Sequence, residues 1–161
     1  MAFAMLRAES LRALIENPLF LAPLSSWIIA QILKMVIFLL QGKRRSGREI
    51  LETVAWRTGG MPSSHAALVT SLAVSAAYRA GIDSDLFIVT LFFALIIMRD
   101  AMGVRRSSGL QARALNSLGY QLGQKGDLEY HPVKEVHGHT PMEVVVGALL
   151  GFFIAAAYEF L

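Results

Sequence analysis

Four long apolar stretches of the sequence decide what this chain can fold into. They cover residues 19–40, 61–80, 86–104 and 142–161, and a helix of about 20 apolar residues is long enough to cross a bilayer. The second and fourth stretches contain many small residues, which let membrane helices approach one another closely. We therefore predict an all-α integral membrane helical bundle with about four transmembrane helices, in a single domain over residues 1–161.

Composition supports this fold class. The chain is 55% hydrophobic and 17% charged, whereas soluble domains carry about 25% charged residues. This balance argues against a soluble globule, a disordered chain and a nucleic-acid-binding module. A soluble all-α protein with buried helices is the alternative, and it would need more polar surface than these stretches offer. The absence of cysteine excludes disulfides, thiolate metal sites and cysteine nucleophiles.

Two further segments are predicted to be amphipathic helices at the membrane interface. The first 17 residues mix apolar with charged side chains and lack the apolar core of a secretory signal. Between the third and fourth stretches, an apolar residue recurs every fourth position, at Leu110, Ala114, Leu118 and Leu122. This spacing places the four side chains on one face of a helix, which we expect to cover part of the bundle.

The topology places two connections on the same side of the membrane. With four spans, the first and third connections share a side and both termini lie on the other. The bases of these two connections are Lys43, Arg44, Arg45, Arg48, Arg57, Arg105, Arg106, Arg113, Lys125 and Lys134. Because basic connections stay on the cytoplasmic side, we predict a cell inner membrane protein whose two large connections are cytoplasmic.

Ionisable residues at membrane depth are candidates for function, because a charge in lipid is costly. Apart from Arg79 and Glu159, which lie at the opposite ends of their spans, they are Lys34, His65, Arg99, Asp100, His139 and Glu143. The end of the first span, the start of the second, the end of the third and the start of the fourth all lie on the same side. These side chains are therefore predicted to converge at one face of the bundle.

The second span begins with Pro62-Ser63-Ser64-His65, after two glycines. A helix start of this kind exposes backbone N–H groups that attract anions. Ser63 and Ser64 add hydroxyl donors, and His65 can carry a proton near neutral pH. The alternative is helix capping by Ser63 or Ser64, with His65 as an interfacial polar residue.

The fourth span begins with His139-Thr140-Pro141-Met142-Glu143. Thr140 and Glu143 have the spacing of a capping box, and Glu143 also lies one helical turn after His139. A carboxylate that accepts a hydrogen bond from one imidazole nitrogen fixes the tautomer and makes the other nitrogen more nucleophilic. The two roles are compatible, so Glu143 is predicted to cap the helix, to orient His139, or to do both.

A third polar cluster follows the third span. Its arginines, Arg99, Arg105 and Arg106, suit bidentate contacts with phosphate, although the last two could simply anchor the membrane surface. Asp100 is expected to form an ion pair, and ligation of a divalent metal is the alternative. Two histidines, a carboxylate and several bases fit a reaction in which one histidine attacks phosphorus and the other protonates the leaving oxygen.

These motifs resemble those of a known superfamily. Pro62-Ser63-Ser64-His65 resembles the Pro-Ser-Gly-His motif of the type-2 phosphatidic acid phosphatases, which are related to vanadium haloperoxidases. His139-Thr140-Pro141-Met142-Glu143 resembles their His-x-x-x-Asp motif, with glutamate for aspartate. With Asp100-Ala101-Met102-Gly103-Val104-Arg105-Arg106 included, the chain is similar to the small, divergent branch of bacterial membrane proteins in that superfamily. It lacks the usual Lys-x6-Arg-Pro motif.

The resemblance implies a role for each residue. His139 would be the nucleophile, Glu143 its orienting acid, and His65 the proton donor to the leaving group. The implied substrate-binding set is Ser63, Ser64, Lys34, Arg99, Asp100, Arg105, Arg106 and Lys134. The reaction of the superfamily is usually metal-independent, so neither a metal nor another cofactor is expected.

We therefore expect a phosphatase of membrane lipid phosphates or lipid pyrophosphates, acting through a phosphohistidine at the cytoplasmic interface. Its substrate would be a phospholipid or a polyprenyl phosphate. The alternatives are a non-catalytic lipid-phosphate binding or transport protein with the same basic site, and a structural membrane subunit. The small-residue face of Gly147 and Gly151 could pack within the chain or between copies in a homo-oligomer.

Overall fold

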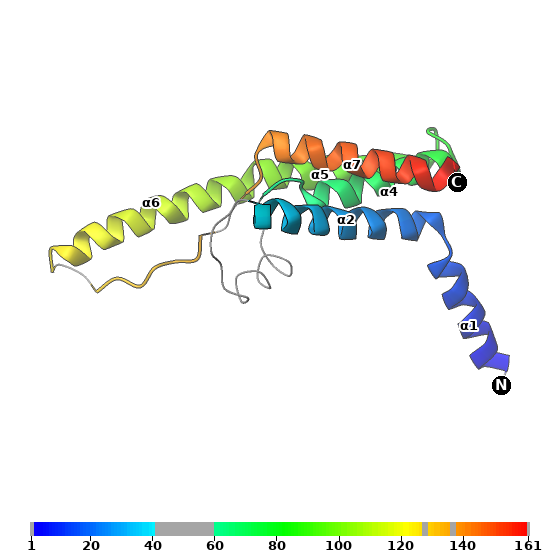
Figure 1. The fold of residues 1–161 in the computed structure, drawn as a ribbon, viewed down its shortest axis with the longest axis horizontal. Coiled ribbons are helices and arrows are strands. Elements are labelled where there is room, and N and C mark those ends of the chain that lie inside the picture. The colour runs from blue at the N-terminus through cyan, green and yellow to red at the C-terminus, as the bar shows by residue number, and fades with distance from the viewer. Residues whose placement is uncertain (1, 41–59, 127–128, 136–137, 161) are drawn as a thin grey trace.

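The computed structural model describes residues 2–40, 60–126, 129–135 and 138–160, and it describes side chains from residue 9 onward. Within these ranges the chain is helical and has no strand, which confirms the predicted all-α class. The helices are α1 (Ala2–Ile15), α2 (Pro18–Leu40), α4 (Ser64–Ala80), α5 (Asp85–Met102), α6 (Val104–Gln124) and α7 (Pro141–Phe160) (Figure 1). The predicted basic connection over 41–59 lies outside the described residues.

Helices α2, α4, α5 and α7 form the bundle (Figure 1). Helix α4 packs against each of the other three, so it lies at the centre of the bundle. Its buried side chains are small or hydroxylated: Ser64, Ala66, Ala67, Val69, Ser71, Ala73, Ser75 and Ala76. Small side chains at every turn let three neighbouring helices approach the α4 backbone closely.

Helices α4 and α7 approach each other closely. Gly147 and Gly151 of α7 face the α4 backbone, where an added Cβ would collide with the carbonyl oxygens of Ser63 and Ala67, respectively. The small-residue face therefore packs within the chain. Ala155, one turn further along α7, is also fully buried.

Three helices are long and apolar enough to cross a membrane among the described residues. They lie at Pro18–Leu40, within the helical stretch Asp85–Gln124, and at Pro141–Phe160. A membrane helical bundle is therefore confirmed, whereas four spans are not shown. Helix α4, predicted as the second span, has 17 residues. It contains alanine and serine in place of large apolar side chains because it faces protein rather than lipid.

Helix boundaries follow local capping chemistry. Ser63 precedes α4 and accepts a hydrogen bond from the Ala66 backbone N–H, while Ser84 does the same for Phe87 at the start of α5. Gly81 ends α4 with a φ of 93°, a conformation that favours glycine. A single residue, Gly103, separates α5 from α6.

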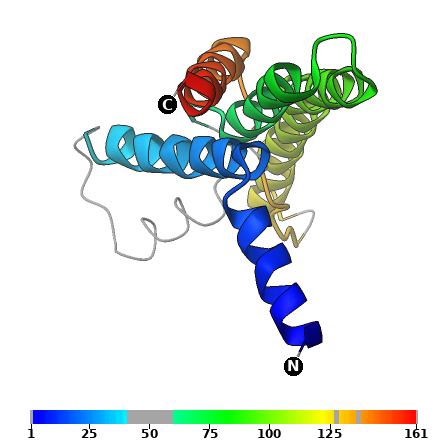
Figure 2. The same ribbon diagram turned by 90° about the vertical axis from the view of Figure 1, so that its right-hand side faces the viewer.

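The predicted interfacial helices both leave the bundle. Helix α1 turns away from it, as two perpendicular views show (Figures 1 and 2). Helix α6 continues beyond the end of α5 and contacts no described helix except α5, so the prediction that it covers the bundle is wrong. Its apolar stripe is exposed, with Leu110 at 57% and Leu118 at 54% exposure, because Gly109, Asn116 and Gly119 are the residues it buries.

Candidate functional site

Four helix ends that are distant in sequence meet at one end of the bundle. The Ser63 backbone N–H, before α4, donates to the carbonyl of Glu143 in α7 at 2.9 Å. The His139 backbone N–H, before α7, donates to the carbonyl of Ala101 in α5 at 3.0 Å. On the α2 side, a Cβ on Gly60 would lie 3.8 Å from the Lys34 Cγ. The convergence predicted from topology is therefore present in the fold (Figure 1).

The entry to α7 is a capping box that also holds an imidazole. The Thr140 backbone N–H donates to Glu143 Oε2 at 3.1 Å, and the Glu143 N–H donates to Thr140 Oγ1 at 3.4 Å. The same Oε2 lies 3.0 Å from Nδ1 of His139. Both readings of Glu143 hold together, because one oxygen serves the helix cap and the histidine.

This hydrogen bond sets the state of the His139 ring. A carboxylate only accepts hydrogen bonds, so Nδ1 carries the proton and Nε2 keeps its lone pair. His139 is 4% exposed, and this burial lowers the pKa of the imidazole below its usual value, with the hydrogen bond to Glu143 opposing the shift. The ring is therefore neutral at pH 7, which is the form that can act as a nucleophile.

Positive charge and hydroxyl groups lie at the same end of the bundle as this ring. Lys34 is 6% exposed although it belongs to the apolar helix α2, and its charge acts on both His139 and Glu143. Ser63 and Ser64 are buried at the start of α4, where Ser63 caps the helix as the simpler interpretation predicted. The first turn of α4 directs its backbone N–H groups toward this end of the bundle, which favours an anion.

His65 lies at the edge of this cluster and is exposed. Electrostatic interactions connect it with Arg105, His139, Lys34 and Asp100. The two histidines therefore belong to one electrostatic neighbourhood, in which His139 is buried and His65 reaches solvent. Such a pair combines a protected ring with one that can exchange protons with water.

Asp100 forms the ion pair that the sequence led us to expect. Its Oδ2 accepts a hydrogen bond from Nε of Arg105 at 2.7 Å, and both side chains are partly exposed. Among the described residues, no group of three or more His, Asp and Glu side chains could hold a metal ion.

The structure does not gather the whole predicted binding set. In the described part of the chain, no hydrogen bond or ion pair links the side chains of Arg99, Arg106 or Lys134 to either histidine. Arg99 and Arg106 are exposed at the junction of α5 and α6, and Lys134 is exposed beside α6. Lys34, Ser63, Ser64, Asp100 and Arg105 remain as the cluster around His65, His139 and Glu143.

Sequence reasoning missed two backbone positions that place His139. One is Ala101, whose carbonyl accepts from the His139 N–H. The other is Gly138, where a Cβ would collide with the Arg106 backbone, so only glycine allows this approach. A glycine directly before a histidine at a helix start is a sequence pattern that could have indicated such a contact. Nothing in the sequence indicates that Ala101 contacts His139.

Comparisons with known proteins agree with this geometry. The family described as the divergent PAP2 family matches residues 15–154. The uncharacterized membrane protein YuiD of Bacillus subtilis (strain 168) is 36% identical over an aligned length of 161. The alignment covers 92% of this chain and 99% of the relative. No solved structure matches the chain. The helical bundle, the paired histidine motifs and these two matches show that this membrane protein belongs to the divergent PAP2 family.

Proposed function

We propose that the chain is a phosphatase of membrane lipid phosphates or lipid pyrophosphates that acts through a phosphohistidine at His139. The observation that carries this proposal is the 3.0 Å hydrogen bond between Nδ1 of the buried His139 and Glu143 Oε2. It leaves the Nε2 lone pair free to attack phosphorus. The membership of the divergent PAP2 family adds support.

The reaction has two steps. In the first, Nε2 of His139 forms a bond to phosphorus while the bond from phosphorus to the lipid oxygen breaks, and a protonated His65 gives its proton to that oxygen. In the second, water attacks phosphorus while the bond between phosphorus and Nε2 of His139 breaks, His65 takes a proton from the water, and phosphate leaves. The Glu143 carboxylate stabilises the positive charge that develops on the His139 ring.

The other groups of the cluster would bind the phosphate oxygens. Lys34 places a positive charge beside His139 in a buried setting, where electrostatic interactions are stronger than in water. We infer that the N-terminal N–H groups of α4 and the Ser64 hydroxyl are further donors to the phosphate. Arg105 contributes less net charge, because Asp100 neutralises it.

Turnover by the purified protein tests this proposal. Phosphate release is measured in detergent micelles against a panel of phospholipid phosphates and polyprenyl phosphates and pyrophosphates. We expect His139→Ala to remove turnover and His65→Ala to lower it by about 10²- to 10⁴-fold, the usual contribution of a general acid. The matched control is His131→Ala, because the side chain of His131 is 89% exposed and lies outside the cluster.

Covalent trapping separates the phosphatase from the binding protein considered above. Brief incubation with a ³²P-labelled substrate should label the wild type through an acid-labile bond on His139, and the label should be absent from His139→Ala. Retained turnover in His139→Ala would reject the mechanism. Tight binding of labelled lipid phosphate without release or covalent labelling would instead favour a non-catalytic lipid-phosphate binding or transport protein.

The proposed setting is a single domain over 1–161 with its site at the cytoplasmic face of an inner membrane. Support comes from the bases of α6, which leaves the bundle at the end that holds the cluster, and from the bases of the sequence 41–59 that follows α2. The chain has no cysteine, so a single introduced cysteine can show which side of the membrane its position faces. We expect Asp83→Cys, at the opposite end, to react with an impermeant maleimide in intact cells, and Gln121→Cys in α6 to be protected.

A further inference from the structure

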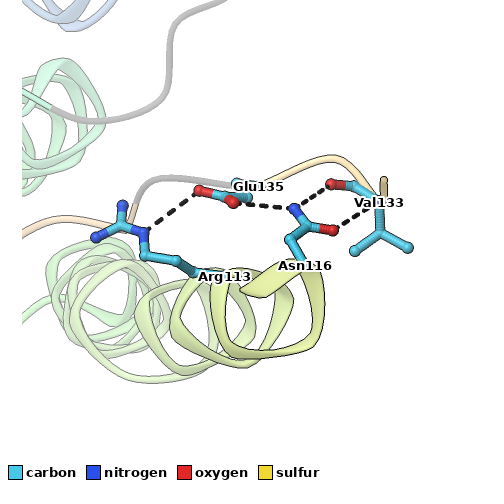
Figure 3. A network of polar contacts seen from close by, with 4 residues as sticks. All are labelled: Arg113, Asn116, Val133 and Glu135. Carbon is cyan, nitrogen blue, oxygen red and sulfur yellow. Dashed lines mark hydrogen bonds and ion pairs between the residues drawn. The ribbon is translucent and has the colours of Figure 1, made fainter. Parts of the chain in front are cut away.

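The segment before His139 is fastened along α6 by one buried amide side chain (Figure 3). Asn116 is 7% exposed. Its Nδ2 donates to the Val133 carbonyl at 3.0 Å, and its Oδ1 accepts from the Val133 N–H at 2.9 Å. The side chain thus pairs with both backbone polar groups of a single residue, which fixes the register of residues 129–135 on the helix.

Asn116 has no unused hydrogen-bonding capacity. Its Nδ2 also donates to Glu135 Oε1 at 2.9 Å, and its Oδ1 also accepts from the Tyr130 hydroxyl at 2.6 Å. An asparagine amide can donate two hydrogen bonds and accept two. Three residues of the returning segment are therefore held by one side chain, and this arrangement cannot be kept by any smaller residue.

Other contacts guide the same segment along the helix. Gly119 allows the Tyr130 ring to lie against α6, since a Cβ there would collide with that ring. Arg113 donates to Glu135 Oε2 at 3.3 Å (Figure 3). Gly138 then lies against the Arg106 backbone. The segment is thus in contact with α6 from Gly119 back to Arg106, in the first turn of the helix.

We propose that Asn116 is a positioning residue for His139, and its effect on turnover rests on the function proposed above. Val133 lies six residues before His139. Slippage of an extended segment by one residue would move the chain by about 3.3 Å. A displacement of about 1 Å at a reacting atom can already cost about 10²-fold in rate, so the register set by Asn116 decides whether Nε2 reaches phosphorus.

Chemical modification of His139 tests this without relying on turnover. Diethyl pyrocarbonate is added to the purified full-length protein, and carbethoxylation of each histidine is followed by mass spectrometry. His139 is buried in the wild type, while the exposed His65 is an internal reference. In Asn116→Ala we expect modification of His139 to accelerate roughly tenfold, the effect of losing about one net hydrogen bond, with His65 unchanged.

Two matched variants keep the test decisive. Gln121→Ala removes an exposed amide from the same helix and should leave the modification rate of His139 unchanged. Tyr130→Phe removes only one of the four hydrogen bonds made by Asn116, so its rate should lie between those of the wild type and Asn116→Ala. If Asn116→Ala fails to fold, this milder variant provides the comparison. Wild-type rates at His139 in whichever variant folds overturn the proposal.

Kinetics separates this inference from the proposed function. For an active wild type, we expect Asn116→Ala to lower kcat by about 10- to 100-fold with KM changed less than about twofold, because the side chains that bind phosphate are untouched. A rise in KM alone with constant kcat would contradict positioning. If the wild type releases no phosphate, the proposed function fails, while the modification rates still decide whether Asn116 positions His139.

Discussion

Adding one methyl group to the α4–α7 contact should separate the two helices at the centre of the bundle. At Gly151, the new Cβ would collide with the Ala67 carbonyl oxygen and would lie 2.9 Å from its carbonyl carbon and 3.0 Å from its Cα. All three neighbours are backbone atoms of a buried helix, so no side chain can rotate away. The strain can be relieved only by moving α7 away from α4, which loosens contacts along the whole pair.

Overpacking of this kind costs typically about 1–3 kcal/mol. For a chain of this size, each kcal/mol lowers Tm by about 2–4 °C, so Gly151→Ala should lower Tm by roughly 2–12 °C. Gly147→Ala should match it in stability and should also weaken the site. Its Cβ would push on the Ser63 carbonyl, next to the N–H that donates to Glu143.

Thermal unfolding in detergent, followed by circular dichroism at 222 nm, measures the effect. Ala157→Val is the matched control, because it adds bulk to an exposed position of the same helix and should change stability by less than about 0.5 kcal/mol. A Tm for Gly151→Ala within about 1 °C of the wild type, a shift smaller than any that overpacking predicts, would refute the close approach of the two backbones. An equal loss in Ala157→Val would show that the effect is not specific to this contact.

Three further predictions concern the site and helix α6. Burial lowers the pKa of His139, so the folded protein binds fewer protons than the unfolded chain below about pH 6.5. The free energy of unfolding should therefore be highest above that pH and should fall as the pH drops through the lowered pKa. The fall should be smaller in His139→Gln, and Tm measured from pH 8 to 5 will show both effects. Lys34→Met should weaken vanadate binding about tenfold, the loss of one charge-assisted contact, without unfolding the protein; unchanged binding measured by calorimetry would exclude Lys34 from the anion site. Leu118→Ser in the exposed stripe of α6 should change Tm by no more than about 2 °C, and a larger loss would mean that another surface covers it.

The sequence predicted the fold class and the convergence of the site well, because both follow from topology. Apolar length sets where helices lie, and their alternating direction brings the ends near Lys34, His65, Asp100 and His139 to one side. The pairing of His139 with Glu143 was also predictable, since a spacing of four within one helix start leaves few other arrangements.

Contacts between segments that share no local pattern could not be predicted. The apolar stripe at Leu110 and Leu118 indicated a helix correctly but gave its buried face wrongly. The buried face consists of Gly109, Asn116 and Gly119, whose value lies in close approach and hydrogen bonding rather than in hydrophobicity. Likewise, Lys134 looked like a phosphate ligand from its sequence neighbourhood, yet its segment runs beside α6.

Because Glu143 Oε2 serves both groups, the start of α7 and the orientation of the His139 ring must form together. Because that oxygen completes the first turn of α7 and also orients His139, the imidazole is held in one tautomer and orientation only once α7 has begun to form. Chains still emerging from the ribosome, or chains frayed at this turn, carry every residue of the cluster but not an oriented imidazole. The nucleophile proposed above is therefore oriented only in chains whose helix α7 has started to form.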